Sequence, residues 1–165
     1  MVELEAFRDG MALLGSAVSV ITTDGAAGRA GFTATAVCSV TDQPPTLLVC
    51  VNRSSYVHRF FAENRVMCVN LLGGHQEAVS GRFANRALDM EARFAAGEWE
   101  VSHTGAPVLA DALATFDCRI VDAHEVGTHT VFYGAVAGVR RQQVPRSLVY
   151  FNRAYHALGA DEVSA

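Results

Sequence analysis

The chain has 165 residues, a length that fits one domain, and 50% hydrophobic against 18% charged residues exclude an intrinsically disordered protein. Its 13 basic residues are all arginine and face 17 acidic ones, so we expect no nucleic-acid partner, no lysine Schiff base and no P-loop lysine. No apolar run approaches the roughly 20 residues of a membrane span, and the acidic N-terminus is no secretory leader. We therefore expect no membrane partner and a cytoplasmic location.

The first third of the chain predicts one helix followed by strands. Apolar residues recur every three to four positions near the N-terminus, which predicts an amphipathic helix over 3–14. β-branched residues predict a strand at 17–23, and DGAAG at 24–28 is typical of a hairpin loop. Residues 30–41 alternate in polarity and predict one continuous strand. After two prolines, the apolar run 46–51 predicts a strand buried on both faces.

The rest of the chain predicts further strands around one helical insert. Serines after Asn52 are candidate N-caps of a helix that would direct Tyr56, Phe60 and Phe61 toward the core. We expect strands at 65–72, 114–124, 129–140 and 148–151, and a helical insert at about 75–95. In the less regular segment 84–112, we expect Phe94 and Trp99 to anchor the chain to the core. With no repeat or linker, residues 1–165 predict a single, mainly β domain with flanking helices, built as a closed barrel.

Cysteines and isolated charged residues carry little functional signal. No C-x-x-C pair or zinc-finger spacing occurs, so we predict no metal site and no disulfide. The cysteines at 38, 50 and 68 lie in strand-like runs and are interpreted as buried free thiols. The histidines at 58, 75, 103 and 124 are interpreted as surface residues. Arginines 86 and 93 lie near acidic residues 89 and 91, which predicts ion pairs on a helix surface.

Two segments are candidates for binding a ligand. Alternation would place the hydroxyls of Thr33, Thr35 and Ser39 on one side of one strand, where interleaved alanines leave room for a flat group and Gly31 permits a close backbone approach. Taken alone, the hydroxyl pattern is better explained by a solvated outer face of an edge strand. Gly31 and the polar run that follows the next strand favour a ligand instead. The run 52–55 offers an amide, a guanidinium and two hydroxyls at a predicted helix start, which favours a phosphate, although ordinary helix capping is the alternative.

A third candidate is Gly127-Thr128-His129, between two predicted strands. A histidine beside a glycine turn at the mouth of a barrel can donate, accept or carry charge toward a ligand, but it can also be a plain surface residue. No G-x-G-x-x-G fingerprint, G-x-S-x-G elbow or H-E-x-x-H motif accompanies it.

Several segments together resemble the short-chain flavin reductases of two-component flavin-dependent monooxygenase systems. They are the run from Phe32 to Asn52 with its double proline, together with 7–11, 67–71, 127–129 and 155–156. The resemblance covers about residues 5–158 and is greatest to the reductases of pyrimidine degradation and of 4-hydroxyphenylacetate hydroxylation. It implies an FMN-binding split β-barrel, a six-stranded Greek key that forms a homodimer.

The resemblance also implies an activity and a site. The activity is that of an NAD(P)H:flavin oxidoreductase, which reduces free FMN or FAD by hydride transfer from NADH or, alternatively, NADPH. The reduced flavin then diffuses to a partner monooxygenase. His129 is implied as the catalytic residue on the nicotinamide side. The implied cofactor-binding residues are His129 together with Thr33, Ala34, Thr35, Ala36, Ser39, Val40, Asn52, Ser54, Ser55, Phe83 and Gly127.

Two other functions fit the same sequence. One is a flavin- or haem-binding barrel without reductase turnover, since a fold does not fix a function. The other is a structural or interaction barrel whose threonine face is solvated. Oxidation of NADH in the presence of added flavin distinguishes the reductase from both.

Overall fold

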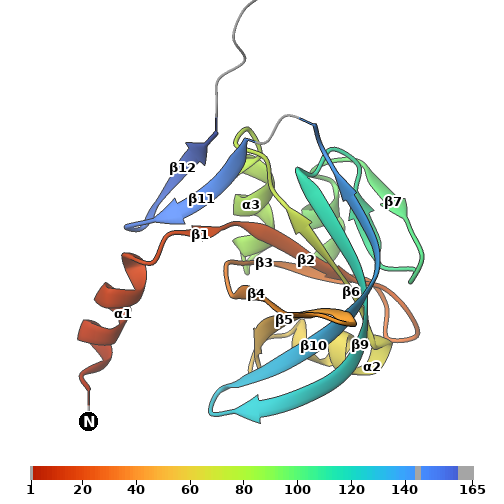
Figure 1. The fold of residues 1–165 in the computed structure, drawn as a ribbon, viewed down its shortest axis with the longest axis horizontal. Helices are drawn as coiled ribbons and strands as arrows, with labels where there is room; N and C mark the ends of the chain where they lie inside the picture. Colours follow the sequence, from red (N-terminus) through yellow and green to blue (C-terminus); the bar gives the residue numbers. More distant parts are fainter. Residues whose placement is uncertain (1, 144–145, 160–165) are drawn as a thin grey trace, which may run out of the picture.

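The computed structural model describes residues 2–143 and 146–159 and is built around one seven-stranded antiparallel sheet (Figure 1). In spatial order the strands are β3 (Ala30–Ala34), β2 (Ser19–Thr23), β6 (Val66–Leu71), β9 (Ala114–Val126), β10 (His129–Arg141), β5 (Pro45–Asn52) and β4 (Val37–Asp42). Two small sheets join β1 (Ser16–Ala17), β11 (Ser147–Phe151) and β12 (Ala154–Leu158), and β7 (Trp99–Val101) with β8 (Pro107–Leu109). The described helices are α1 (Leu4–Ala12), α2 (His58–Asn64), α3 (Glu77–Ala84) and α4 (Met90–Phe94).

The mainly β class with flanking helices is confirmed, but the predicted closed barrel is wrong. β3 and β4 are the two edges of the sheet, and within the described residues no ladder joins them. Instead, α3 and α4 pack against β3, so this edge strand is covered by helices rather than paired. The six-stranded Greek key implied by the resemblance is not confirmed.

The predicted single strand over 30–41 is two strands on opposite edges of the sheet. β3 ends at Ala34, the chain bends at Thr35 and Ala36, and β4 begins at Val37. Thr33, Thr35 and Ser39 therefore do not share one face of one strand. The alternation continues through the bend because each half alternates by itself, so the pattern could not reveal the break.

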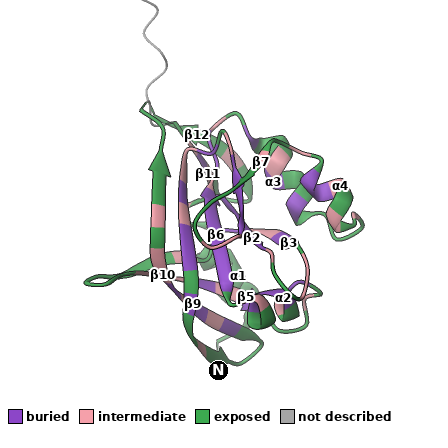
Figure 2. Ribbon diagram, turned by 90° about the vertical axis from the view of Figure 1, so that its right-hand side faces the viewer, coloured by how far each residue is buried: buried purple, intermediate pink, exposed green. Residues whose placement is uncertain are grey.

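Two large apolar clusters form the core, and they lie on opposite faces of β2, because Ile21 belongs to the first and Val20 to the second. The buried residues run along the central strands (Figure 2). All residues of β2 are buried, and so are all of β6 except Leu71. As predicted, Phe60 and Phe61 of α2 enter the first cluster, and Phe94 enters the second with Trp99 packed against it. The same prediction is wrong for Tyr56, which precedes α2 and is 66% exposed, because its ring lies on the outside, edge-on to Phe60.

β5 differs from its prediction. A strand buried on both faces was expected, yet only its alternate residues Leu47, Val49 and Val51 are fully buried. The intervening residues are half-buried, because they point to the opposite face of the sheet, which is less covered at β5. One of them, Cys50, lines a cavity at the end of the strand.

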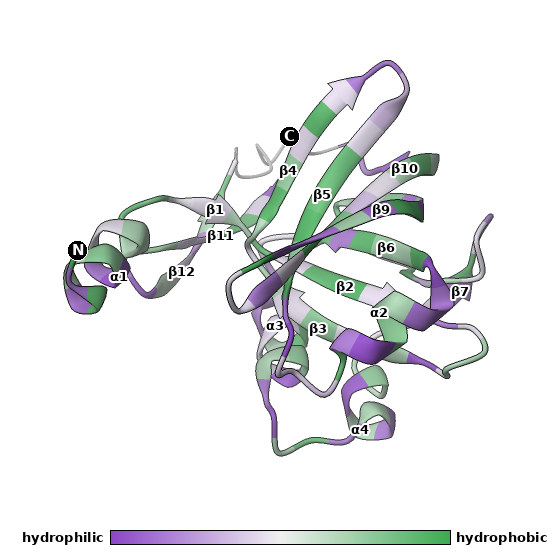
Figure 3. Ribbon diagram, turned by 90° about the horizontal axis from the view of Figure 1, so that it is seen from below, coloured by the Kyte–Doolittle hydropathy of each residue, from purple (hydrophilic) through white to green (hydrophobic). Residues whose placement is uncertain are grey.

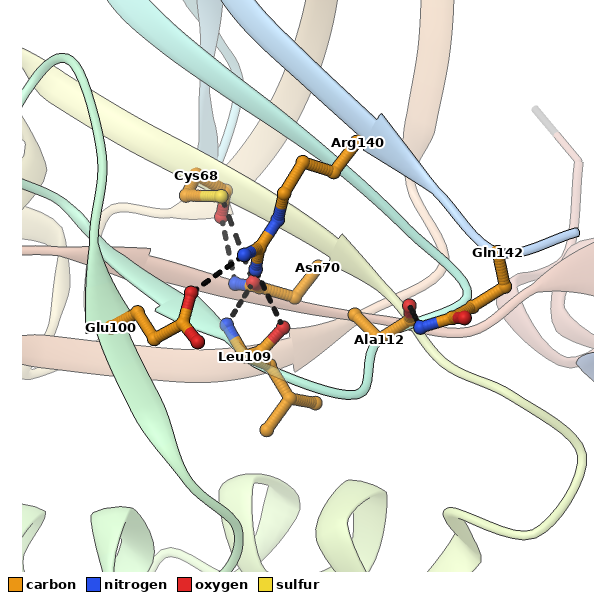
Figure 4. Close-up of polar contacts among 7 residues, drawn as sticks. All are labelled: Cys68, Asn70, Glu100, Leu109, Ala112, Arg140 and Gln142. Carbon is orange, nitrogen blue, oxygen red and sulfur yellow. Dashed lines mark hydrogen bonds and ion pairs between the residues drawn. The ribbon is translucent and has the colours of Figure 1, made fainter.

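A buried polar network fastens β8 and the β7 arm to the main sheet (Figure 4). The Asn70 amide Nδ2 donates to the Val20 carbonyl at 3.0 Å and to Thr22 Oγ1 at 3.1 Å, while Asn70 Oδ1 accepts from the Leu109 amide at 2.7 Å. Arg140 of β10 pairs with Glu100 of β7 at 2.6 Å. Asn70 itself is fully buried, and every fully buried side-chain nitrogen or oxygen in the described ranges has a hydrogen-bond partner.

The cysteines divide by burial. Cys68 and Cys118 are fully buried, and burial raises the pKa of both thiols, that of Cys118 to about 12. Cys68 is thus confirmed as a buried free thiol, whereas Cys50 is half-buried and Cys38 is exposed because edge strand β4 has no neighbour on one side. Among the described helices, none is long and apolar enough to cross a membrane. The cytoplasmic location stays a prediction.

α1 and the small β1–β11–β12 sheet lie to one side of the main sheet (Figure 3). α1 confirms the expected amphipathic helix, although it ends at Ala12 rather than at residue 14. None of its residues is buried within the chain. Its apolar residues Leu4, Phe7 and Met11 are 60%, 58% and 48% exposed. The apolar face of α1 therefore has no cover among the described residues.

Candidate functional site

A cavity of about 830 Å³ lies where the chain crosses from β3 to β4. One side of it is formed by the end of β3 and the crossover, and the other by the end of β5 and the turn that follows. The segment 83–93, from the end of α3 into α4, closes a third side. Its lining residues are Phe32, Thr33, Ala34, Thr35, Ala36, Cys50, Val51, Asn52, Ser54, Ser55, Tyr56, Val57, Phe83, Ala84, Arg86, Ala87, Leu88, Asp89, Met90, Arg93 and His129.

The crossover presents small side chains to the cavity. Ala34 is buried at the end of β3, while Thr35 and Ala36 are exposed. The Cys50 amide donates to the Ala36 carbonyl at 3.2 Å, which fixes the crossover against β5. Methyl groups and one hydroxyl at these positions leave a shallow ledge that a flat ring can approach.

The turn after β5 supplies polar groups on the opposite side. Asn52 Oδ1 accepts from the Ser54 amide at 2.9 Å and from Ser54 Oγ at 2.8 Å, so the amide side chain organises the turn. The predicted helix capping by these serines is wrong, because α2 begins only at His58 and has no side-chain cap at Val57. The turn is thus a polar loop at the cavity rather than the first turn of a helix.

His129 begins β10 directly opposite Asn52 in the ladder. Its Nδ1 lies 2.9 Å from Thr128 Oγ1, and its exposed ring borders the cavity. Gly127, with φ of 55°, forms the preceding hairpin turn, where a left-handed backbone favours glycine. The predicted turn–histidine unit at the cavity mouth is therefore present in the geometry.

A second cavity of about 560 Å³ adjoins the same turn and shares Asn52 and Ser54 with the first. Gly127 lines this second cavity, not the first. Arg53 also lines the second cavity, and its guanidinium pairs with Glu125 at 3.2 Å. His58, predicted to be a surface residue, is instead half-buried here because its Nε2 lies 2.8 Å from Thr130 Oγ1.

Thr33 and Thr35 lie between the main cavity and a third one of about 380 Å³, which also borders Tyr150, Arg153 and Tyr155. Thr33 Oγ1 donates to the Ser80 carbonyl at 2.6 Å, so this hydroxyl is already engaged with α3. Thr35 has no such bond among the described residues and borders both spaces. Thr35 is therefore the freer of the two hydroxyls.

Phe83 forms a buried wall of the cavity. Its ring packs edge-on against Phe94 at 5.1 Å between centroids and lies 5.4 Å from Trp99. A Cβ atom on Gly31 would lie 2.8 Å from Phe83 Cε1. The expected close approach at Gly31 exists, but it is made by this phenylalanine ring rather than by a ligand.

The predicted ion pair of Arg93 with Asp89 or Glu91 does not form. The Arg93 side chain is 7% exposed, and it donates to backbone carbonyls: Nε to Leu88 at 3.1 Å, and Nη1 to Gly31 and Phe83 at 3.1 and 3.2 Å. Burial lowers the pKa of its guanidinium. The charge pattern of 86–93 could not reveal that Arg93 bonds to backbone carbonyls, because α4 has too few residues to show which side faces inward.

Nine of the twelve residues that the sequence assigned to the cofactor line the main cavity: Thr33, Ala34, Thr35, Ala36, Asn52, Ser54, Ser55, Phe83 and His129. Ser39 and Val40 are exposed on β4 and line none of the three cavities. Sequence reasoning missed Arg93, Tyr56 and the loop 84–90. Only the interruption of periodicity after residue 83 hinted that this loop serves something other than the core.

The cavity fits a flat heteroaromatic ligand with a polar tail. Its volume is within the roughly 300–1,000 Å³ of small-molecule sites. It combines a small-residue ledge, aromatic and aliphatic walls, hydroxyls and an amide at the β5 turn, and a buried guanidinium. An isoalloxazine ring with a phosphorylated chain matches this combination of groups.

Comparisons with known proteins agree with this fit. The family model for the flavin reductase like domain matches residues 11–159. FMN reductase (NADH) RutF of Escherichia coli O6:K15:H31, strain 536, is 52% identical over 158 residues, which cover 96% of each chain. The crystal structure of a candidate flavin reductase from Haemophilus somnus 129PT superimposes with a TM-score of 0.92 at 45% identity, covering 95% of this chain and 100% of that one. The styrene monooxygenase flavin reductase of Pseudomonas putida S12 superimposes with a TM-score of 0.83 at 27% identity, covering 94% and 98%.

Proposed function

The chain belongs to the flavin reductase-like domain family, and on that premise we propose that it is an NADH-dependent flavin reductase whose preferred flavin is FMN. The observation that carries the proposal is the main cavity. It gathers nine of the residues that the family resemblance assigns to flavin, from four segments far apart in the sequence. We extend the proposal to residues 1–165 as one flavin reductase domain.

NADH and flavin supply the redox chemistry when both are bound, because the nicotinamide C4 gives a hydride to the flavin N5. The chain's task is to orient them and to exclude water. In the proposal, Ala34 to Ala36 form the ledge under the ring, and the Asn52–Ser55 turn donates to the phosphate. His129, exposed at the mouth, contacts the nicotinamide. Gly127 acts indirectly by shaping the His129 turn, and Ser39 and Val40 have no part.

No side chain has to act as a strong base in this reaction. The only acid lining the main cavity among the described residues is Asp89, and its Oδ1 already accepts from the Ala92 amide at 2.8 Å as the N-cap of α4. An arrangement of hydroxyls, one imidazole and two guanidinium groups suits binding and charge stabilisation rather than proton abstraction. This composition supports hydride transfer between two bound nucleotides.

We also propose that the reduced flavin leaves for a separate monooxygenase component. Three of the residues that line the cavity, Ala36, Ser54 and His129, are exposed to solvent, which suits release of a product rather than a permanent prosthetic group. The similar reductase of Pseudomonas putida serves a styrene monooxygenase. For this chain, FMN and NADH are the proposed small-molecule substrates.

A homodimer is the proposed assembly. The uncovered apolar residues of α1 need a cover, and a second copy of the chain offers an equivalent apolar surface. Phe7→Glu places a charge in this face and is expected to convert dimers to monomers in light scattering. Glu5→Lys, on the polar side of the same helix, is the control and should remain dimeric. A monomeric wild-type protein would contradict this assembly.

Steady-state NADH oxidation with FMN, FAD and riboflavin, compared side by side, tests the activity. We expect turnover that depends on added flavin and is fastest with FMN. Flavin binding without NADH oxidation would instead identify a flavin carrier. A colourless protein that neither binds FMN nor oxidises NADH would identify a structural barrel.

A further inference from the structure

Arg93 is held in one orientation by three backbone carbonyls from three different segments. Nε donates to Leu88 in the loop before α4, and Nη1 donates both to Gly31 of β3 and to Phe83 of α3. These bonds occupy Nε and Nη1 of the guanidinium. Because the contacts fix the plane of the group, the guanidinium cannot swing freely as a surface arginine does.

The remaining nitrogen, Nη2, takes part in none of these bonds. In residues 2–143 and 146–159 no hydrogen bond to Nη2 is found. No fully buried side-chain nitrogen or oxygen in the same ranges lacks a partner, so Nη2 cannot be fully enclosed. The open space that Arg93 borders is the main cavity. A side chain that is 93% buried thus offers its last donors to the cavity's interior.

Arg93 is also the most deeply placed charge in the cavity. The other charged side chains that line it, Arg86 and Asp89, are exposed, and His129 is exposed at the mouth. A charge shielded from water acts more strongly on a bound ligand than an exposed one, because the local dielectric constant is lower. Arginine stays protonated at neutral pH even with its pKa lowered by burial.

The position of Arg93 selects one part of a flavin. Arg93 is bonded to β3 and α3, whereas the Asn52–Ser55 turn follows β5, on the other side of the cavity. If the turn takes the phosphate, the group that reaches Arg93 belongs to the ring. The ring carries its acceptors on the pyrimidine portion and at N5. Among these positions, the N1–C2 edge is the one that gains negative charge on reduction.

We propose that Arg93 Nη2 binds the N1–C2 edge of the flavin and stabilises the anionic reduced ring more than the neutral oxidised ring. The inference rests on the proposed function and adds a charge-sensing residue to the same site. A hydrogen bond from a buried cation to an anion is stronger than a hydrogen bond from the same cation to a neutral acceptor. We therefore expect the wild-type protein to bind reduced flavin roughly 10- to 100-fold more tightly than oxidised flavin.

The test is an anaerobic titration of wild-type protein and Arg93→Met with oxidised and dithionite-reduced FMN and riboflavin. Arg93→Met should abolish the preference for the reduced form with both ligands. Riboflavin lacks the phosphate, so a loss confined to FMN would mean that Arg93 binds the phosphate and would overturn the inference. Arg82→Met is the matched control, because Arg82 also donates to a carbonyl of this insert, that of Ala92 at 3.1 Å, but does not line the cavity.

A second variant guards against misfolding. Arg93→Gln is neutral but keeps amide donors for the carbonyls, so it should fold even if Arg93→Met does not, and it should also lose the preference. Retention of the preference in either folded variant, or its absence from the wild-type protein, overturns the inference. A wild-type protein that binds no flavin at all refutes the proposed function instead, so the two failures are distinguishable.

Discussion

Two groups of polar residues in this molecule differ in where their hydrogen-bond partners come from and in how far they are exposed to solvent. Around Asn70, the amide, the Thr22 hydroxyl and the Leu109 backbone satisfy one another and are closed to water. Around the main cavity, the side chains of Asn52, Ser54 and His129 bond only to near neighbours in the sequence, and Ser54 and His129 are exposed. The comparison teaches that the first region stabilises the fold, while the second keeps donors available for a ligand.

The sharpest way to test this division is Ala36→Leu. A larger side chain on the ledge occupies space that the flat ring needs, so the affinity for FMN should fall by roughly 100-fold. The free energy of unfolding should change by less than about 0.5 kcal/mol, because residue 36 is exposed. Fluorescence titration and urea unfolding measure the two quantities.

Ala137→Leu is the control for this change, since Ala137 is an exposed alanine of β10 outside the three cavities. It should leave FMN affinity unaltered. Wild-type affinity in Ala36→Leu would remove the crossover from the flavin site.

The opposite pattern is expected for Asn70→Leu. Loss of the amide leaves the Leu109 N–H and the Val20 carbonyl without their buried partner, so the free energy of unfolding should fall by about 3 kcal/mol. FMN affinity of the folded fraction should stay unchanged, because Asn70 lines no part of the cavity. A variant as stable as wild type would show that the network is not a stabilising feature.

The buried thiols of Cys118 and Cys68 make the free energy of unfolding depend on pH. The folded state keeps the Cys118 thiol protonated up to about 12, whereas the unfolded thiol ionises above its ordinary pKa of 9.0. The unfolded state therefore binds fewer protons as pH rises, and stability falls between these two values, by about 1 kcal/mol at pH near 10 from Cys118 alone. Cys68 shifts in the same direction.

Urea midpoints at neutral and alkaline pH measure this effect. Cys118→Ala should flatten the pH dependence, while Cys38→Ala, at an exposed thiol, should leave it as in wild type. An identical slope in Cys118→Ala would contradict the assignment to this thiol.

The smallest effect is expected at the cavity mouth. His129→Ala should raise the apparent KM for NADH about 5-fold with little change in kcat, because one exposed hydrogen bond contributes about 1 kcal/mol. His124→Ala, on the neighbouring strand and paired with Asp122 at 3.1 Å, is the control. An unchanged KM would exclude His129 from nicotinamide binding.

The elements that sequence predicted well are those whose pattern is local. α1 and most strands of the main sheet carry a clear period, and Phe60 and Phe94 anchor the core as expected. The break at Thr35–Ala36 escaped prediction because alternation does not reveal which neighbour a strand has. β12 and the β7–β8 pair were missed since they are short and largely defined by long-range pairing.

For the site, the residues assigned by the family resemblance gather at one cavity more fully than those assigned by residue chemistry. Thr33 to Ala36 and the Asn52–Ser55 turn line one cavity although the predicted shared strand face does not exist. Arg93 could not be found from sequence, because whether an arginine faces solvent or three carbonyls depends on how α4 packs against β3. Burial of a charged group is a tertiary property, and no local spacing encodes it.

A crystal structure of the protein with FMN tests the central claim most directly. The ring is expected against Ala34 to Ala36, with its phosphate within hydrogen-bond reach of the turn at Asn52–Ser55. An FMN molecule seated elsewhere, such as the third cavity beside Tyr150 and Tyr155, would contradict the assignment of the site.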